Sequence, residues 1–329
     1  MWLRPGTSGR TIAGLPRHEP MTSRTRLFES PAGLVERVDY CSRSRRWLSA
    51  EHFSPHFQVA FPYRGAFVWH VGDDAVMSDP NQILFIKGGE PFRVEEHRPD
   101  GFGEVIITPS DSTLRDVAAA EGFDGDRHPL FAVRRRRATP ELQRRCIEFL
   151  HRAGNGCALE LGANEALIAL LRDALRMKAL WPVASPQTRR LIRRAKEYLD
   201  ARFTQRVQLS EVSAAVGASP AYLTDVFRRV EGISLQRYAI QLRLARALIE
   251  LPHAPDITRL ALDLGFSSHS HFTLAFRRGF GCTPSQFRGL TRPRLAHLAF
   301  PPGQMRVRER GMLQNKSDAI QDDADAMVR

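Results

Sequence analysis

Two pairs of adjacent arginines, Arg228-Arg229 and Arg277-Arg278, lie 49 residues apart in the last third of the chain. A guanidinium stays charged near neutral pH and donates hydrogen bonds in a planar fork that suits phosphate oxygens. Each pair directly follows a phenylalanine within a segment of helical apolar spacing. The repeated placement favours contacts with phosphate groups. The alternative is a solvated helix face, the usual place of charged runs.

The positive charge of the chain is concentrated around these pairs. The net charge is +12, and residues 188–292 hold 17 Arg and Lys against 8 Asp and Glu. The rest of the chain is nearly balanced, with 31 basic and 28 acidic residues. A basic surplus confined to one segment is typical of a domain that binds a polyanion. Charge alone would also fit RNA or an anionic membrane surface.

The sequence gives little support for a metal site, a disulfide framework, an enzyme or a membrane protein. The four cysteines are scattered and form no CxxC pair, so we expect reduced thiols and neither a metal site nor a disulfide framework. We find no Ser/His/Asp grouping and no phosphate-cradling glycine loop, so we expect no enzyme and no cofactor. No apolar run approaches about 18 residues, and the basic N-terminus lacks a signal-peptide core. These features predict a cytoplasmic protein without a membrane partner.

An internal duplication surrounds the arginine pairs. Residues 223–232 correspond to 272–281 with an offset of 49, while the residues just upstream, 209–217, correspond to 257–265 with an offset of 48. Each copy predicts a helix, a turn and a second helix. Gly217 and Gly265 end the first helices, because glycine tolerates the left-handed conformation. Ser219 and Ser268 cap the second helices.

The remaining elements of each copy fit this pattern. Pro220 suits a first helical position, and Asp256 is a predicted N-cap of the second copy. A helix predicted over residues 235–251 joins the copies, with Tyr238, Leu242 and Ala245 on its apolar face. Two amphipathic helices joined by a short glycine-containing turn are the layout of the DNA-binding helix-turn-helix. A tandem copy within a basic segment strengthens that interpretation.

The N-terminal half predicts a different architecture. Short apolar runs separated by turn residues extend from about Phe53 to Thr108, which favours an antiparallel barrel or sandwich. Helices are predicted over 114–120, 141–151 and 164–180. The last carries an apolar stripe that either packs within the chain or forms a dimer seam: Leu167, Leu170, Leu171, Ala174 and Leu175. Residues 181–186 break the pattern and are predicted to be a linker.

The C-terminal segment resembles the DNA-binding domain of the AraC/XylS family. The stretches that carry the resemblance are 219–223, 227–232, 243–247, 265–272 and 276–288. It implies seven helices, with a long helix joining two helix-turn-helix units and one recognition helix of each in successive major grooves of double-stranded DNA. The N-terminal half is more loosely similar, at 54–65 and 79–82, to the cupin-like sensory barrel of that family. Its histidines do not reproduce the cupin metal set, so we expect no metal.

Together these observations predict an α+β multidomain protein. We expect a disordered tail at 1–22, a sensory and dimerisation domain at 23–182, a DNA-binding domain at 188–292 and an irregular tail at 293–329. The expected function is a transcription regulator that acts as a homodimer on DNA, with RNA polymerase as a further partner and an unknown small-molecule effector. The alternatives are a cupin-type enzyme carrying a DNA-binding appendage and a regulator without small-molecule input.

Helical phase places Ala221, Thr224 and Asp225 on the outer face of the first recognition helix and His269, Ser270, Thr273 and Leu274 on that of the second. The family resemblance implies base contacts at the positions of Ala221, Thr224, Asp225, Ser270, His271 and Leu274. The predicted base-facing residues are therefore Ala221, Thr224, Asp225, His269, Ser270, His271, Thr273 and Leu274. The predicted phosphate contacts are Arg228, Arg229, Arg277 and Arg278. Asp225 can only accept hydrogen bonds, for instance from cytosine N4, and Leu274 offers only apolar contact. The alternative for Asp225 is a surface charge paired with Arg228 or Arg229.

Overall fold

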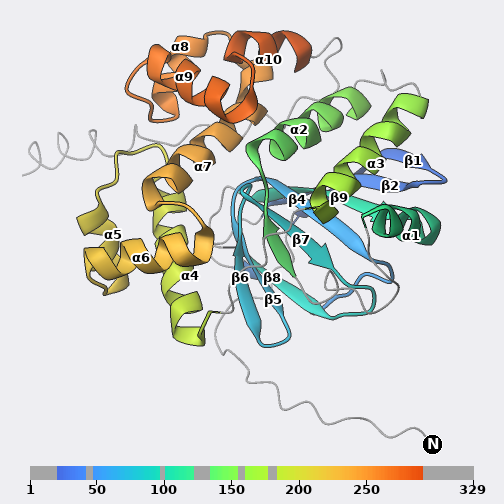
Figure 1. Ribbon diagram of the computed structural model, residues 1–329, viewed down its shortest axis with the longest axis horizontal. Coiled ribbons are helices and arrows are strands. Elements are labelled where there is room, and N and C mark those ends of the chain that lie inside the picture. The colour runs from blue at the N-terminus through green and yellow to red at the C-terminus, as the bar shows by residue number, and fades with distance from the viewer. Residues whose placement is uncertain are drawn as a thin grey trace, which may run out of the picture. The chain divides into compact units, whose positions relative to one another are not determined.

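The computed structural model describes residues 21–41, 47–96, 101–121, 134–154, 160–176 and 184–291. Within these ranges, strands and three helices come first along the chain and seven α-helices follow (Figure 1). No helix in the described ranges is both long and apolar enough to span a membrane. The predicted α+β architecture, with an all-helical C-terminal part, is confirmed.

The N-terminal half is built on two antiparallel sheets. The six-stranded sheet has the order β1 (Met21–Ser30), β2 (Gly33–Cys41), β9 (Phe102–Pro109), β4 (Gln58–Arg64), β7 (Gln82–Ile86) and β10 (Arg135–Arg137). The four-stranded sheet has the order β3 (Trp47–Leu48), β8 (Phe92–Glu96), β5 (Phe67–Val71) and β6 (Asp74–Ser78). We call these ten strands the β domain.

The two sheets enclose an apolar core. Val38, Ala60 and Leu84 of the six-stranded sheet pack with Phe67 and Trp69 of the four-stranded sheet. All five residues of β7 are buried, so the six-stranded sheet is covered on both faces there. A strand buried on both faces reads as a continuous apolar run, which is why residues 83–86 were found from the sequence.

The β domain begins earlier than predicted. β1 starts at Met21, two residues inside the segment predicted as a disordered tail, and β1 to β3 all precede Phe53. Most of β1 is exposed at the edge of its sheet, so it lacks the apolar alternation that marks a half-buried strand. Residues 1–20 and 292–329 lie outside the described ranges, so the tail predictions there stay predictions.

Three helices lie beside the six-stranded sheet: α2 (Pro140–Gly154) and α3 (Glu160–Arg176) pack on its strands, and α1 (Asp111–Ala120) packs against α3 (Figure 1). Their predicted positions are confirmed within the described ranges, although α3 begins four residues before Asn164. Residues 177–180, the predicted end of this helix, lie outside those ranges. The leucine stripe of α3 is buried within the chain, and none of its five side chains exceeds 1% exposure. The stripe therefore packs internally, and a dimer seam along these residues is excluded.

Seven α-helices form the C-terminal part, which we call the helical domain. They are α4 (Pro186–Ala201), α5 (Leu209–Val216), α6 (Pro220–Glu231), α7 (Leu235–Glu250), α8 (Ile257–Asp263), α9 (His269–Phe280) and α10 (Pro284–Thr291), with the short 3-10 helix η3 (Leu251–His253) after α7. The number of helices implied by the family resemblance is confirmed within the described ranges.

The first of these helices begins two residues earlier than the predicted domain boundary. The Ser185 side chain accepts a hydrogen bond from the amide of Thr188, and Pro186 occupies the first turn. Proline at that position needs no amide hydrogen because the first turn has no acceptor for it. The Ser-Pro pair was predicted to be linker, but it starts a helix.

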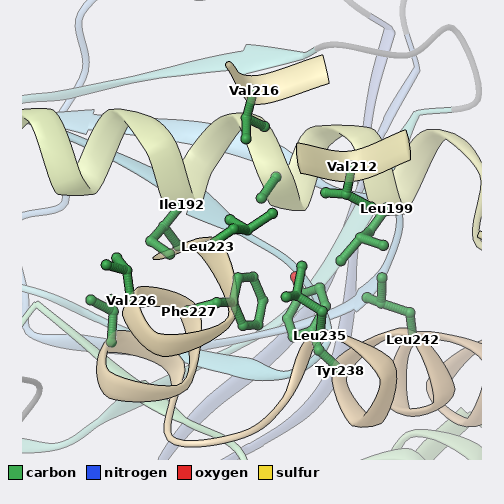
Figure 2. Close-up of a cluster of buried hydrophobic side chains, with 12 residues drawn as sticks. Ile192, Leu199, Val212, Val216, Leu223, Val226, Phe227, Leu235, Tyr238 and Leu242 are labelled. Atoms are coloured by element: carbon green, nitrogen blue, oxygen red, sulfur yellow. The ribbon is translucent and has the colours of Figure 1, made fainter. Parts of the chain in front are cut away.

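The first helix-turn-helix unit is held by an apolar cluster (Figure 2). Leu223 and Phe227 of α6 are fully buried against Ile192 of α4, Val216 of α5 and Tyr238 of α7. Burial of side chains of this size contributes about 1.5–3 kcal/mol each. This cluster fixes the inner face of α6, and so determines which side chains of α6 face solvent.

Candidate DNA-binding surface

The second helix of each unit starts and ends in the same way. Ser219 accepts a hydrogen bond from the amide of Tyr222 at the start of α6, and Ser268 accepts one from the amide of His271 at the start of α9. Both helices end at a glycine whose amide donates to the carbonyl of the first arginine of the pair. The duplication seen in the sequence is therefore a duplication of capped recognition helices.

The outer face of α6 carries the predicted residues. Ala221, Thr224, Asp225, Arg228 and Arg229 are all exposed, as helical phase predicted. The hydroxyl of Thr224 donates to the carbonyl of Pro220 at 2.8 Å, which leaves its lone pairs for an outside donor.

Asp225 is not free on this surface. Its carboxylate forms an ion pair with the guanidinium of Arg229, four residues later on the same helix. This is the surface pairing that was the alternative to base reading. The ion pair also occupies Arg229, which is one of the predicted phosphate contacts.

The outer face of α9 matches the prediction with one difference. His269, Ser270, His271 and Leu274 are exposed, and Leu274 keeps 49% of its surface. Thr273 was predicted to face outward, but it is half-buried, and its hydroxyl oxygen is buried without a hydrogen-bond partner in the described ranges. Thr273 lies on the flank of the helix, where phase alone does not decide exposure.

His271 is oriented by its neighbours. Its Nδ1 lies 3.0 Å from the hydroxyl of Ser267, and its ring meets Phe266 edge-on at 5.4 Å between centroids. The imidazole therefore has Nε2 available for an outside partner. Among the described residues no group of three or more His, Cys, Asp or Glu could hold a metal ion.

The arginine pairs differ in their availability. Within the described ranges, no hydrogen bond or ion pair involves the side chains of Arg228, Arg277 or Arg278, and all three are exposed. Arg229 alone is paired. Three exposed guanidiniums thus lie beside the recognition faces of α6 and α9, where they can reach phosphate oxygens.

Two features of this surface were missed from the sequence. Tyr222, in the first turn of α6, keeps 54% of its surface. Arg243 of α7 donates to the carbonyls of Phe203 at 2.6 Å, Gln205 at 2.7 Å and Gly265 at 2.7 Å. It thereby ties the loop after α4 to the turn of the second unit. A single sequence carries no signal for contacts between residues this far apart.

The turn of the second unit is tightly packed. Gly265 adopts φ of +82°, and a Cβ there would collide with the carbonyl oxygen of Thr204. Its counterpart Gly217 adopts φ of +72°, and nothing lies within 4 Å of the position that a Cβ would take. Only glycine fits at Gly265, so the two units are held together at a point where the backbones nearly touch.

The β domain holds polar groups in its interior, and a small cavity lies where it meets the helices. Burial raises the pKa of Glu104 on β9 to about 8, and one oxygen of that carboxyl has no hydrogen-bond partner in the described part of the chain. A cavity of about 20 Å³, lined by Phe61, Tyr63, Cys146 and Leu248 among others, lies where β4, α2 and α7 meet. It has room for about one water molecule. It is too small for an effector.

Comparisons with known proteins match both halves of the chain. A family described as "Helix-turn-helix domain" matches residues 212–289, and one described as "AraC-like ligand binding domain" matches residues 40–171. Together the two matches take in the β domain from the end of β2, the helices that cover it and most of the helical domain. The chain belongs to the AraC/XylS family of transcriptional regulators.

Several curated regulators are similar over part of their length. The Msm operon regulatory protein of Streptococcus mutans is 26% identical over 132 residues, 40% of this chain and 47% of that protein. Regulatory protein PocR of Salmonella typhimurium is 31% identical over 98 residues, 30% of this chain and 32% of that protein. The chain thus matches between about a third and a half of the length of these relatives.

The solved structures that are similar to this chain match it with low TM-scores. An AraC-type DNA-binding domain from Chromobacterium violaceum is 26% identical, with a TM-score of 0.30, and the match covers 32% of this chain and 95% of that one. ToxT from Vibrio cholerae is 13% identical, with a TM-score of 0.32, and the match covers 82% of this chain and 98% of that one.

Proposed function

We propose that this chain is a one-component transcription regulator that binds specific double-stranded DNA through α6 and α9. The observation that carries the proposal is the repeated recognition face. Two capped helices in tandem each expose a row of side chains beside arginines that have no partner within the described residues. One helix in each of two successive major grooves, about 34 Å apart, is the arrangement by which tandem units read DNA.

The proposed readers fall into two groups. Ala221 and Thr224 would face bases in one groove, beside Asp225 paired with Arg229, and Ser270, His271 and Leu274 would face bases in the next. Arg228, Arg277 and Arg278 would contact phosphates and contribute affinity without sequence preference. His269 and Thr273 stay predicted contacts, with Thr273 the weaker because of its burial.

We assign the β domain the role of sensing a small-molecule effector. The support is the match of residues 40–171 to a ligand-binding domain. The buried carboxyl of Glu104 is a group that such a ligand could meet inside the domain. A homodimer and contact with RNA polymerase belong to the same proposal. A homodimer would use a surface other than the leucine stripe of α3.

The test is selection of DNA from a random duplex library by the full-length chain. Recovery of one bipartite sequence whose halves are one helical turn apart is expected, because two recognition helices are joined in one chain. Recovery of random sequence, with binding that competitor DNA removes fully, would exclude specific recognition. Elemental analysis for iron or zinc tests the cupin-type enzyme instead, because that alternative requires a bound metal.

A further inference from the structure

The carboxyl of Glu104 on β9 lies in the interior of the β domain, far from any role in the DNA-binding surface. Phe102 and Ile106, two residues before and after it, pack in the apolar core. Successive residues of a strand point to opposite faces, so Glu104 points into the same core. Glu104 is 5% exposed, and one of its carboxyl oxygens has no hydrogen-bond partner in the described residues. A buried acceptor without a donor costs free energy, so this position favours a partner that the chain itself does not supply.

A second carboxyl lies on the same face of the sheet. Val38 of β2 is directly opposite Glu104. Glu36, two residues before Val38, is directly opposite Ile106. Glu36 and Glu104 are therefore diagonal neighbours, which lie about 7–8 Å apart on the face of an antiparallel pair of strands. A cationic nitrogen that meets a carboxylate oxygen on each side, at about 2.7–2.9 Å, fits between two such side chains. We call Glu36 and Glu104 the carboxyl pair.

One cation of the chain lies on the outer side of the carboxyl pair. Arg24 of β1 is directly opposite Val38, and its Nη1 donates to Glu36 at 2.9 Å. The side chain of Arg24 is 52% exposed, and that of Glu36 is 11% exposed. A guanidinium thus reaches the carboxyl pair from solvent. Because half of the arginine side chain is in water, it can leave Glu36 by rotation about its own bonds.

Stacked aromatic rings lie next to the carboxyl pair. Tyr40 of β2 is directly opposite Phe102, and the two rings stack at 4.3 Å between centroids. The ring of Phe67 on β5 also stacks with that of Phe102, at 4.3 Å. Tyr40 is the other diagonal neighbour of Glu104, and burial followed by the charge of Glu104 raises the pKa of Tyr40. Aromatic faces attract organic cations through the ring quadrupole, so these rings add to the attraction of the carboxyls.

The charge balance of the site also favours a cation. Burial raises the pKa of Glu104 to about 8, and the charge of Arg24 acts in the opposite direction. Glu104 therefore holds a proton at neutral pH. A positive charge beside a carboxyl favours its ionised form, so an entering ammonium takes the place of that proton, which is released. Two carboxyls beside aromatic rings suit an organic ammonium better than a metal ion such as Ca²⁺, which takes about 6–8 oxygen ligands.

We propose that the effector of the β domain is an organic ammonium ion with an apolar or aromatic body. Its charged head lies between Glu36 and Glu104, where the guanidinium of Arg24 now meets the carboxyl pair, and its body lies against the rings of Tyr40 and Phe102. This inference rests on the proposed function, because it names the chemical class of the ligand that the β domain senses.

The test compares three small molecules of similar shape and different charge. Phenethylammonium is the cationic probe, phenethyl alcohol is uncharged and phenylacetate is negative. Each is titrated into the full-length chain at neutral pH by isothermal titration calorimetry. We expect only the ammonium to bind. Equal binding of the alcohol would overturn the proposal, because the site would then select shape and not charge. Absence of ammonium binding at millimolar concentration would overturn it as well.

Variants assign the binding to particular side chains. Glu104→Gln keeps the shape of the protonated carboxyl, so the variant folds, but it cannot ionise. It should weaken ammonium binding about tenfold or more, the effect of losing one charge-assisted hydrogen bond. Arg24→Ala removes the competing guanidinium and should tighten binding severalfold. The matched controls are Glu29→Gln and Arg26→Ala, which break an exposed ion pair on the same strand β1 and should leave the affinity unchanged. Wild-type affinity in Glu104→Gln, or an equal loss in Glu29→Gln, would contradict the proposal.

A DNA titration separates this inference from the proposed function. The duplex selected by the wild-type chain is titrated with and without phenethylammonium, and we expect its affinity to change severalfold in wild type and not in Glu104→Gln. An ammonium that binds through Glu104 without changing DNA affinity would show that the site is not sensory, which overturns the inference. If the chain selects no duplex at all, the proposed function fails, and calorimetry still decides whether the carboxyl pair binds a cation.

Discussion

Asp225 and Arg229 form an ion pair on the outer face of α6, while the equivalent positions of α9, 49 residues later, hold Leu274 and Arg278. One copy therefore neutralises its second arginine, whereas the other leaves it unpaired among the described residues. The two side chains of the pair are 63% and 66% exposed, and exposed pairs of this kind contribute only about 0.2–1 kcal/mol. The pair is weak enough to break on DNA, yet it changes the charge that the surface presents.

Replacing Asp225 should release that arginine. We expect Asp225→Ala to bind all DNA sequences more tightly and to steepen the slope of log K against log salt by up to about 0.9, the contribution of one added phosphate contact. The matched variant is Leu274→Asp, which creates the same pairing with Arg278 and should flatten the slope by a similar amount. Titration of both against selected and scrambled duplexes at several salt concentrations measures this. An unchanged slope with an altered base preference would show instead that Asp225 reads a base.

The arginines of α9 should act on every sequence alike. Replacing Arg277 and Arg278 with Ala is expected to weaken specific and nonspecific binding together, because phosphates carry no sequence information. The salt slope should flatten by up to about two. The same titration checks this, with Arg259→Ala as a control, because Arg259 is an exposed arginine already paired with Asp263 on α8. Loss of sequence preference at full nonspecific affinity would contradict the assignment.

Much of the helical domain follows from the sequence because its signals are local. Ser219, Ser268 and Asp256 cap the predicted helices, and Gly217 stops α5. Each of these signals needs only residues within one turn. The 3.6-residue phase of α6 likewise separates Leu223 and Phe227 from the exposed face.

What the sequence did not predict depends on contacts between distant residues. Strand β1 is an exposed edge strand whose pairing partner alone makes it a strand. The burial of the Thr273 hydroxyl, the three carbonyls bound by Arg243 and the contacts of Arg135 and Arg137 with Glu231 all arise from packing. A run of four arginines such as 134–137 would predict contact with a polyanion, but tertiary structure directs two of the four to the end of α6.

The two recognition helices should read separate halves of the selected duplex. Replacing Ser270 and His271 with Ala is expected to change base preference in one half only, at about 1–3 kcal/mol per good base contact. Replacing Thr224 should affect the other half, about 34 Å away. Reselection of DNA by each variant from the random library provides the measurement. A change spread over both halves would show that the variants move the helices and not the contacts.

The two turn glycines should differ sharply in their tolerance of alanine. Gly217→Ala places a Cβ in open space and costs only the left-handed backbone, about 1–2 kcal/mol. Gly265→Ala suffers the same strain and a collision with the carbonyl of Thr204, which adds about 1–3 kcal/mol. Urea unfolding of the full-length variants gives both free energies. Equal destabilisation would mean that the loop around Thr204 moves aside without cost.

Stability should depend on pH through Glu104. Burial raises the pKa of Glu104 to about 8 from an ordinary value of 4.5, so the folded chain holds a proton at neutral pH that the unfolded chain releases. A carboxyl whose pKa is raised in the folded state contributes stability that is fully present below its pKa in the unfolded chain. This contribution is lost as the pH rises from about 4.5 to about 8. A pKa difference of one between the folded and unfolded chains corresponds to about 1.4 kcal/mol. The free energy of unfolding should therefore fall by several kcal/mol across this window.

Glu104→Gln should remove most of that dependence, because an amide resembles the protonated carboxyl in shape and does not titrate. We expect the variant to be more stable than wild type at pH 8 and to show a flatter profile between pH 5 and 8, about the window set by the two pKa values. The control is Glu36→Gln on β2, which loses the 2.9 Å ion pair between Glu36 and Arg24 and should lower stability. Urea unfolding at several pH values gives the comparison. If Glu104→Gln keeps the wild-type slope, the carboxyl is ionised in the folded chain and has partners that the described residues do not supply.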